Sequence, residues 1–217
     1  MDHLALDPEH LAAPTFATAS AIDGCRAAHA RLLASVDGVD DATVARPSRL
    51  PGWTVGHVVT HLARNADSHV RMIDGALGGE VADQYEGGAE GRAAEVEAGA
   101  GRPAAEQLAD LVASIEALEA AWTRASNEVW GQGFGRSTRG ELLPCADLPF
   151  RRWREVEVHH VDLGLDLDHT SWTAAYVDTE LPLTLAELPA RLPLDDRRVL
   201  LAWLMGRSDT PPALPPW

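Results

Sequence analysis

Histidine and glutamate residues with the spacing of metal ligands occur in two separate segments of the chain. In the later segment, Glu155 and His159 are four residues apart, so on a helix their side chains share one face, about 5–6 Å apart at Cβ. In the earlier segment, His57 and His61 are also four apart, and either could supply a third ligand. Two imidazoles and a carboxylate form the ligand set of catalytic zinc sites that keep an open coordination position.

The same residues have a second interpretation, as helical surface or hydrogen-bonded core residues. A histidine on a helix is most often one of these, and three ligands spread over two helices are a weaker signal than a compact His-Glu-x-x-His motif. Glu157 and His160 point away from the proposed ligand face, because successive residues are about 100° apart around a helix. A non-catalytic, metal-binding helical module is therefore an alternative to an enzyme.

Four long helices are expected to position these side chains. Thr54 is a plausible N-cap, and Pro103 and Pro149 suit the first turn of a helix. A shorter helix is expected near 89–98 and a loop or hairpin over 130–148. These features predict an all-α, four-helix bundle over residues 1–165 whose ligands project inward. Apolar residues recur at helical spacing in four segments, approximately 16–36, 54–77, 103–129 and 149–164.

Residues 166–217 are expected to form a small C-terminal appendage, either helical or α/β. Helical patterns cover approximately 173–192 and 195–205, and no clear strand pattern occurs. The proline-rich tail over 208–217 is not expected to form a regular element.

The composition excludes several classes of function. The net charge of −15 would repel a phosphate backbone, so nucleic-acid binding is not expected. No apolar run reaches the roughly 20 residues that span a membrane, and the first residues lack signal-peptide character, so a cytoplasmic protein is expected. All 18 basic residues are arginine, which removes chemistry that needs a lysine. Cys25 and Cys145 are predicted to be buried and not disulfide-bonded.

Two stretches resemble the mycothiol-dependent maleylpyruvate isomerase family, which shares the DinB-like bundle of thiol-dependent metalloenzymes. They are LPGWTVGHVVTHLARN, residues 50–65, and REVEVHHVDLG, residues 154–164. The resemblance covers most of residues 20–165 and implies a divalent metal held by His61, Glu155 and His159. Zinc is the expected ion, although this ligand set also suits iron, manganese or nickel. Asn65 and Asp162 are candidates to support the ligands, with core packing or capping as an equal alternative.

The resemblance also implies two substrate-binding arginines. Arg92 begins an R-x-x-E-V-x-x-G stretch, and Arg207 follows a glycine in a C-terminal segment that is shorter than the family's. A guanidinium suits a dicarboxylate because its planar fork can bind a carboxylate through two hydrogen bonds.

The implied function is the cis–trans isomerisation of maleylpyruvate to fumarylpyruvate. Mycothiol is the implied cosubstrate, and its metal-bound thiolate would add to the double bond and later be eliminated. The alternative enzyme is a mycothiol S-transferase that joins the thiol to a small electrophile. The expected partners are therefore a small-molecule thiol and a small dicarboxylate or other electrophile, and the sequence predicts no oligomeric state.

Overall fold

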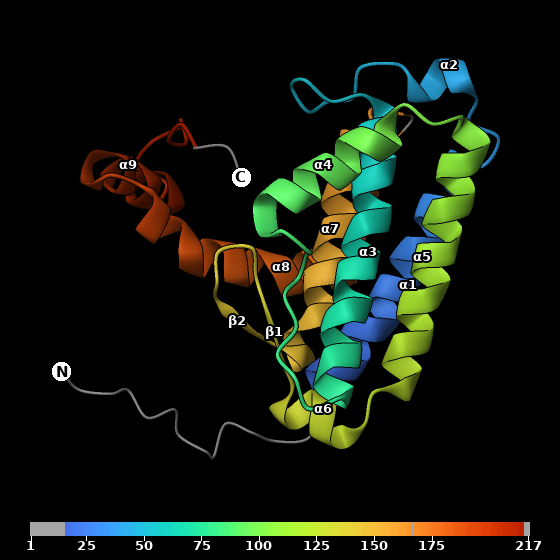
Figure 1. Ribbon diagram of the computed structural model, residues 1–217. Coiled ribbons are helices and arrows are strands. Elements are labelled where there is room, and N and C mark those ends of the chain that lie inside the picture. Colours follow the sequence, from blue (N-terminus) through green and yellow to red (C-terminus); the bar gives the residue numbers. More distant parts are fainter. Residues whose placement is uncertain (1–15, 166, 215–217) are drawn as a thin grey trace. The chain divides into compact units, whose positions relative to one another are not determined.

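A computed structural model describes residues 16–165 and 167–214 (Figure 1). The chain divides into two compact units after Ser171, and each unit is described by itself below.

The first unit is built around four long helices, as the apolar periodicity predicts. They are α1 (Phe16–Val36), α3 (Val55–Leu77), α5 (Ala104–Arg124) and α7 (Leu148–Asp162). Helix α3 packs most extensively against α5, and α1 against α7. Both cysteines are buried and unpaired, as expected. The core between the helices consists of fully buried apolar side chains, among them Leu32, Leu62, Met72, Leu111, Leu118 and Leu148.

Local sequence signals explain where the ligand-bearing helices begin and how closely they approach. The Thr54 side chain accepts from the His57 backbone N–H, and His57 in turn accepts from the Thr54 backbone, so the two form a capping box at the start of α3. Helix α7 starts with a proline in its first turn. Gly24 lets α1 approach α7, because a Cβ at this position would lie 2.4 Å from the Trp153 ring.

The long helix predicted over 103–129 is shorter in the structure. Helix α5 ends at Arg124, Ala125 is extended, and the Ser126 side chain accepts from the Val129 N–H to start the separate α6 (Asn127–Gln132). Serine at an N-cap competes with continuation of the preceding helix. The following segment forms the hairpin alternative, with antiparallel strands β1 (Phe134–Arg136) and β2 (Leu142–Pro144) and Gly135 opposite Leu143. A 3₁₀ turn, η2 (Cys145–Asp147), leads into α7.

Two further helices cover the bundle near the start of α3. One is the short α2 (Asp41–Val44), and the other is α4 (Gly88–Ala100), close to the predicted helix over 89–98. Helix α4 packs against α3, and a Cβ on Gly56 of α3 would lie 2.6 Å from the Ala100 carbonyl oxygen. This close approach holds α4 beside the half of α3 that carries His61.

The described part of the C-terminal unit contains only helices and turns. A 3₁₀ turn, η3 (His169–Ser171), precedes it, and it consists of α8 (Ala174–Glu187), η4 (Leu188–Arg191) and α9 (Leu194–Leu204). The helical alternative is therefore the one observed over 174–204. Leu188, Leu192 and Leu200 form its small core. Residues 208–214 form no regular element, as expected, and 215–217 lie outside the described residues.

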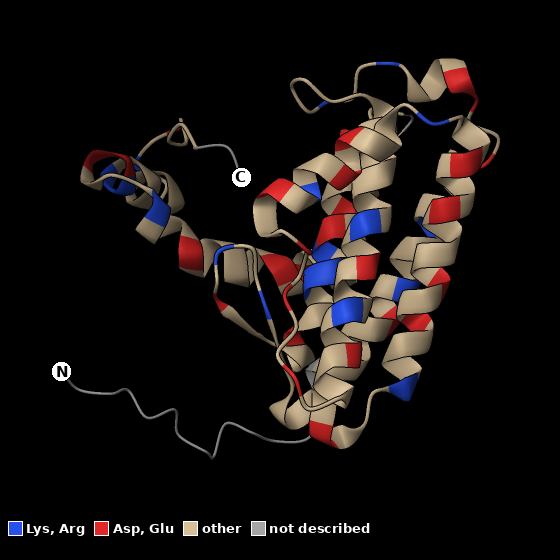
Figure 2. Ribbon diagram, viewed as in Figure 1, with Lys and Arg blue, Asp and Glu red and all other residues tan. Residues whose placement is uncertain are grey.

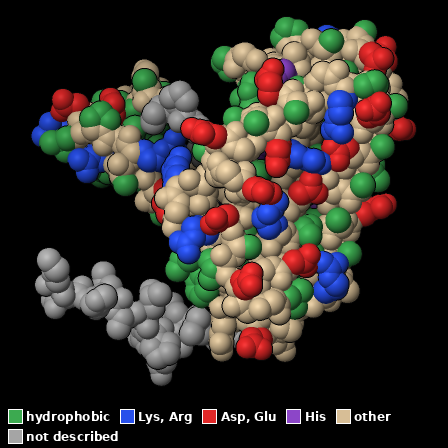
Figure 3. Space-filling model, viewed as in Figure 1, with side chains coloured by type: hydrophobic (Ala, Val, Ile, Leu, Met, Phe, Trp, Pro, Cys, Tyr) green, Lys and Arg blue, Asp and Glu red, His purple; other side chains and the backbone are tan. Residues whose placement is uncertain are grey.

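Arginine and acidic residues alternate along the bundle helices (Figure 2), and their side chains are interspersed on the face of the molecule drawn in Figure 3. Two ion pairs link α3 to α5: Arg64 to Asp110 at 2.6 Å, and Arg124 to Asp74 at 2.8 Å. No helix among the described residues combines the length and apolar character needed to cross a membrane.

Candidate metal centre

His61 lies in the interior of the bundle, on the second turn of α3. Its side chain is 2 % exposed, and its Nε2 is 2.9 Å from Glu155 Oε2 on α7. The imidazole of His159 packs edge-on against it, with ring centroids 4.7 Å apart. The two helices thus bring together side chains that are more than 90 residues apart in the chain.

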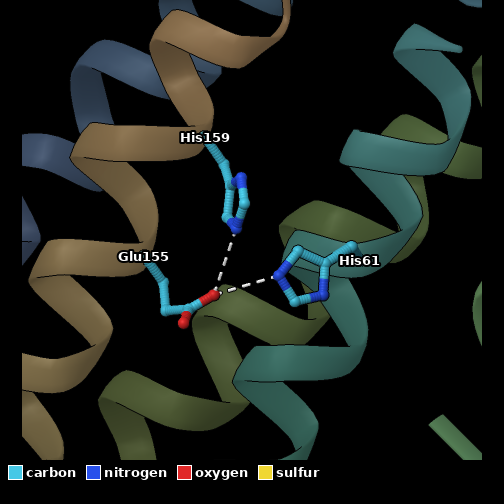
Figure 4. Close-up of side chains that lie close together, drawn as sticks. All are labelled: His61, Glu155 and His159. Atoms are coloured by element: carbon cyan, nitrogen blue, oxygen red, sulfur yellow. Dashed lines mark hydrogen bonds and ion pairs between the residues drawn. The ribbon is translucent and has the colours of Figure 1, made fainter. Parts of the chain in front are cut away.

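Glu155 and His159 lie one turn apart on α7 and both face α3. Their interaction spans 3.4 Å, between Glu155 Oε2 and His159 Nε2. One ligand atom from each of His61, Glu155 and His159 lies within 4.8 Å of the others (Figure 4). This donor set of two imidazole nitrogens and one carboxylate matches a catalytic zinc site.

Asp162 orients the second histidine. Its Oδ2 accepts a hydrogen bond of 2.9 Å from His159 Nδ1. A proton held on Nδ1 directs Nε2 toward Glu155 and His61, which is how carboxylates commonly support metal-binding histidines. Asp162 is therefore placed for the supporting role considered from the sequence.

The environment shifts the pKa values of all three clustered side chains. Burial lowers the pKa of His61 to about 4. For His159, burial opposes the charged form, but hydrogen bonds to Asp162 and Glu155 raise the pKa to about 9. For Glu155, burial acts upward, but hydrogen bonds from the two imidazoles hold its pKa well below the usual value. The cluster therefore combines an ionised carboxylate and a neutral His61 with a His159 whose hydrogen bonds favour its protonated form.

Arg92 on α4 contacts the same cluster. Its Nη2 lies 3.3 Å from His61 Nδ1, and its guanidinium stacks 5.9 Å from the centre of the Trp53 ring. Trp53 also packs edge-on against His61. The structure therefore brings Arg92 to the cluster, together with a tryptophan that the sequence did not single out.

Arg152 was not anticipated from the sequence either. It lies on the same face of α7 as Glu155 and is fully buried. Its Nη1 donates to the Leu62 carbonyl and to Asn65 Oδ1, each at 2.8 Å, and its Nε donates to His29 Nε2 at 3.1 Å. The only sequence signal was helical spacing, since residues 152, 155 and 159 share one face.

Other candidate residues serve different purposes. The Asn65 side chain accepts from Arg152, so it supports the helix packing and not a ligand histidine. His57 caps α3 and is not part of the cluster. Glu157 and His160 point elsewhere, as predicted: Glu157 accepts from Trp153, and His160 contacts Ser35. Arg207 lies in the C-terminal unit, and its assignment to the site stays a prediction.

The fold and the cluster define a class: helical bundles with an inward-facing set of two histidines and a glutamate. Within this class, the chain belongs to the mycothiol maleylpyruvate isomerase family, because the model of that family's N-terminal domain matches residues 25–164. The family resemblance of the two motifs, and the all-α DinB-like fold it implies, are confirmed.

Two solved structures are similar to this chain. The first is the mycothiol-dependent maleylpyruvate isomerase, with a TM-score of 0.70, 25% identity, and coverage of 75% of this chain and 67% of that chain. The second is a histidine-to-alanine mutant of the mycothiol-dependent maleylpyruvate isomerase, with a TM-score of 0.70, 24% identity and the same coverage. No curated protein sequence matches the chain significantly.

Proposed function

We propose that this chain is a mycothiol-dependent maleylpyruvate isomerase whose divalent metal is held by His61, Glu155 and His159. The observation that carries the proposal is the meeting of three ligand atoms from α3 and α7 within 4.8 Å of one another. Membership of the isomerase family supports the reaction. Residues 1–165 would carry this centre and 166–217 the appendage, and a cytoplasmic location stays a prediction from the sequence.

The residues fit a metal such as zinc in number, type and support. Two imidazoles and one carboxylate leave a coordination position open, and Asp162 holds His159 in the required tautomer. When bound, the metal would lower the pKa of a coordinated thiol so that the thiolate is present at neutral pH.

Arg92 would bind a substrate carboxylate. A guanidinium only donates, so in the observed contact His61 Nδ1 accepts from Arg92. A ligand role for His61 Nε2 requires the ring proton on Nδ1, which then cannot accept. Occupation of Nε2 therefore releases Arg92, whose planar fork is free to bind a carboxylate. Arg207 is the proposed second arginine.

The reaction would be a reversible addition. A thiolate that adds to the cis double bond of maleylpyruvate leaves a single bond about which the adduct can rotate, and elimination returns the trans isomer and the thiol. Arg92 would offset the negative charge that develops during the addition. The family and the similar structures favour this reaction over the S-transferase alternative.

The test is an isomerisation assay on the zinc-reconstituted full chain, with and without mycothiol. Glu155→Gln is compared with Glu116→Gln, which removes an exposed carboxylate from α5. We expect turnover only with mycothiol, a fall of at least about 100-fold in Glu155→Gln, and no change in Glu116→Gln. Turnover without thiol, full activity in Glu155→Gln, or accumulation of a stable thiol conjugate would contradict the isomerase proposal.

A further inference from the structure

A polar cavity of about 280 Å³ opens beside the metal cluster, between α3, α7 and the β1–β2 hairpin. Glu155 forms part of its wall and connects it to the cluster. Neutral polar side chains supply half of its lining residues: Asn65, His69, Gln84, Ser137 and Thr138. Arg92 is not part of the lining, so the cavity is separate from the carboxylate-binding contact proposed above.

His69 gives the cavity a specific chemical requirement. Its side chain is 2 % exposed, and burial lowers its pKa to about 3, so the imidazole is neutral. One ring nitrogen hydrogen-bonds with the Leu148 backbone. Because this bond raises the pKa of His69, the backbone partner is the carbonyl oxygen, which accepts from a ring N–H. The other, Nδ1, has no partner among the described residues. It is then a buried acceptor without a donor, a costly state that a ligand O–H or N–H would relieve.

The charged residues of the wall do not select for an anion. Two arginines, Arg139 and Arg151, are matched by two carboxylates, Glu141 and Glu155. A dicarboxylate placed here would meet the lone pair of His69 Nδ1 and the Glu141 carboxylate, which only accept hydrogen bonds. A neutral ligand with many hydroxyl groups can both donate to these acceptors and accept from the arginines and from amides such as Gln84.

We infer that this cavity binds the sugar part of the thiol cosubstrate, a polyhydroxylated group that neither the metal nor Arg92 would recognise. The inference rests on the proposed function for the identity of the thiol, because mycothiol is a cysteine derivative that carries glucosaminyl inositol. The cavity is slightly smaller than the ~300–1,000 Å³ of pockets that enclose a drug-sized ligand, so it holds part of the cosubstrate. The sulfur of the same molecule would then reach the cluster past Glu155.

The test uses two substitutions in the cavity wall and one matched control. Gln84→Ala removes a half-buried amide, and His69→Gln replaces the unpartnered acceptor. Gln132→Ala removes an exposed glutamine from α6, which is outside the cavity. In the isomerisation assay, we expect the KM for mycothiol to rise about fivefold or more in each cavity variant, the usual effect of one lost hydrogen bond. The KM for maleylpyruvate should stay unchanged in the two cavity variants. Gln132→Ala should keep the original KM for both mycothiol and maleylpyruvate.

A binding measurement separates this inference from the proposed reaction. Glucosaminyl inositol, which lacks the thiol, is added to the full chain and its binding is followed by ligand-observed NMR, with N-acetylcysteine as the sugar-free comparison. We expect binding of glucosaminyl inositol that weakens in Gln84→Ala and His69→Gln, even if the chain shows no isomerase activity. Absence of such binding, equal binding by all variants, or a rise in the KM for maleylpyruvate in place of that for mycothiol would overturn the inference.

Discussion

Arg152 donates from Nη1 to the amide oxygen of Asn65 over 2.8 Å, inside the bundle. The bond joins α7 to α3 one turn from Glu155, and the same nitrogen also donates to the Leu62 carbonyl. Glu155 and His159 can meet His61 only if the two helices keep one register along their common interface. Arg152 therefore positions the candidate ligands without contacting them.

Replacing this arginine should loosen the two helices. Arg152→Lys keeps the charge but loses the planar fork, so we expect the free energy of unfolding to fall by about 2–4 kcal/mol, as for other disrupted buried networks. Urea unfolding of the metal-free protein, followed by circular dichroism, measures this change. Arg46→Lys, at an exposed position, is the control. Equal stability of Arg152→Lys and the original chain would contradict the positioning role.

Asp162 should set the affinity for the metal rather than the presence of the site. Its carboxylate accepts from His159 Nδ1 at 2.9 Å, and loss of such a partner typically weakens metal affinity by about 10–100-fold. We expect this loss in Asp162→Leu and a smaller one in Asp162→Asn, which keeps an acceptor oxygen. Competition with a chromophoric chelator gives the Kd, with Asp37→Leu at an exposed position as control. The account of Asp162 would fail if Asp162→Leu bound zinc as tightly as the original chain.

Stability should fall as the pH drops below neutrality, partly because of His29. This imidazole contacts Glu119 through Nδ1 at 2.9 Å and accepts from Arg152 through Nε2. Burial lowers its pKa from 6.5 to about 2, so the unfolded chain takes up the proton first. The stabilising contribution of His29 is therefore complete above about pH 6.5 and is lost progressively as the pH falls toward 2. Between pH 7 and pH 5, one such histidine accounts for about 2 kcal/mol.

The substitution His29→Gln should remove that share of the pH dependence. Urea unfolding of the metal-free protein at pH 7 and at pH 5 gives the change in the free energy of unfolding for each variant. His169→Gln, at an exposed position, is the control. If the free energy of unfolding falls as much between pH 7 and pH 5 in His29→Gln as in the original chain, groups other than His29 cause the acid sensitivity.

The contact between α1 and α7 should tolerate no added methyl group at Gly24. The Trp153 ring is 4 % exposed, and its Nε1 donates to Glu157 at 3.0 Å, so the ring cannot move away freely. We expect Gly24→Ala to cost about 1–3 kcal/mol, as other overpacked cores do, measured by urea unfolding. Gly101→Ala, where a Cβ meets nothing within 4 Å, should be nearly neutral. Similar stability of the two variants would show that the helices are less tightly packed.

Apolar periodicity was sufficient to predict the four helices of the bundle, because each buries one face along its whole length. It did not show the break after Arg124, since the helical spacing continues across it to Val129. There the N-cap preference of Ser126 prevails. Such local competition between a cap and a continuing helix depends on packing that periodicity does not contain.

The ligand set was accessible from the sequence because Glu155 and His159 share a helix face and family motifs singled out His61. The choice between His57 and His61 was not accessible from spacing alone, since both are on α3 and only the packing shows that His57 is used in a cap. The buried role of Arg152 was not predicted, because this residue lies in an arginine-rich stretch typical of a solvated helix face. Its burial depends on acceptors from other helices, His29 and Asn65.

Metal stoichiometry shows directly whether His61, Glu155 and His159 hold a metal ion. The full chain and the variants His61→Ala, Glu155→Gln and Glu116→Gln are incubated with excess zinc, separated from free metal and analysed by inductively coupled plasma mass spectrometry. We expect one zinc ion per chain in the original protein and in Glu116→Gln, and almost none in His61→Ala and Glu155→Gln. An original chain that retains no zinc, or variants of His61 and Glu155 that retain one zinc ion per chain, would show that these residues do not form the metal centre.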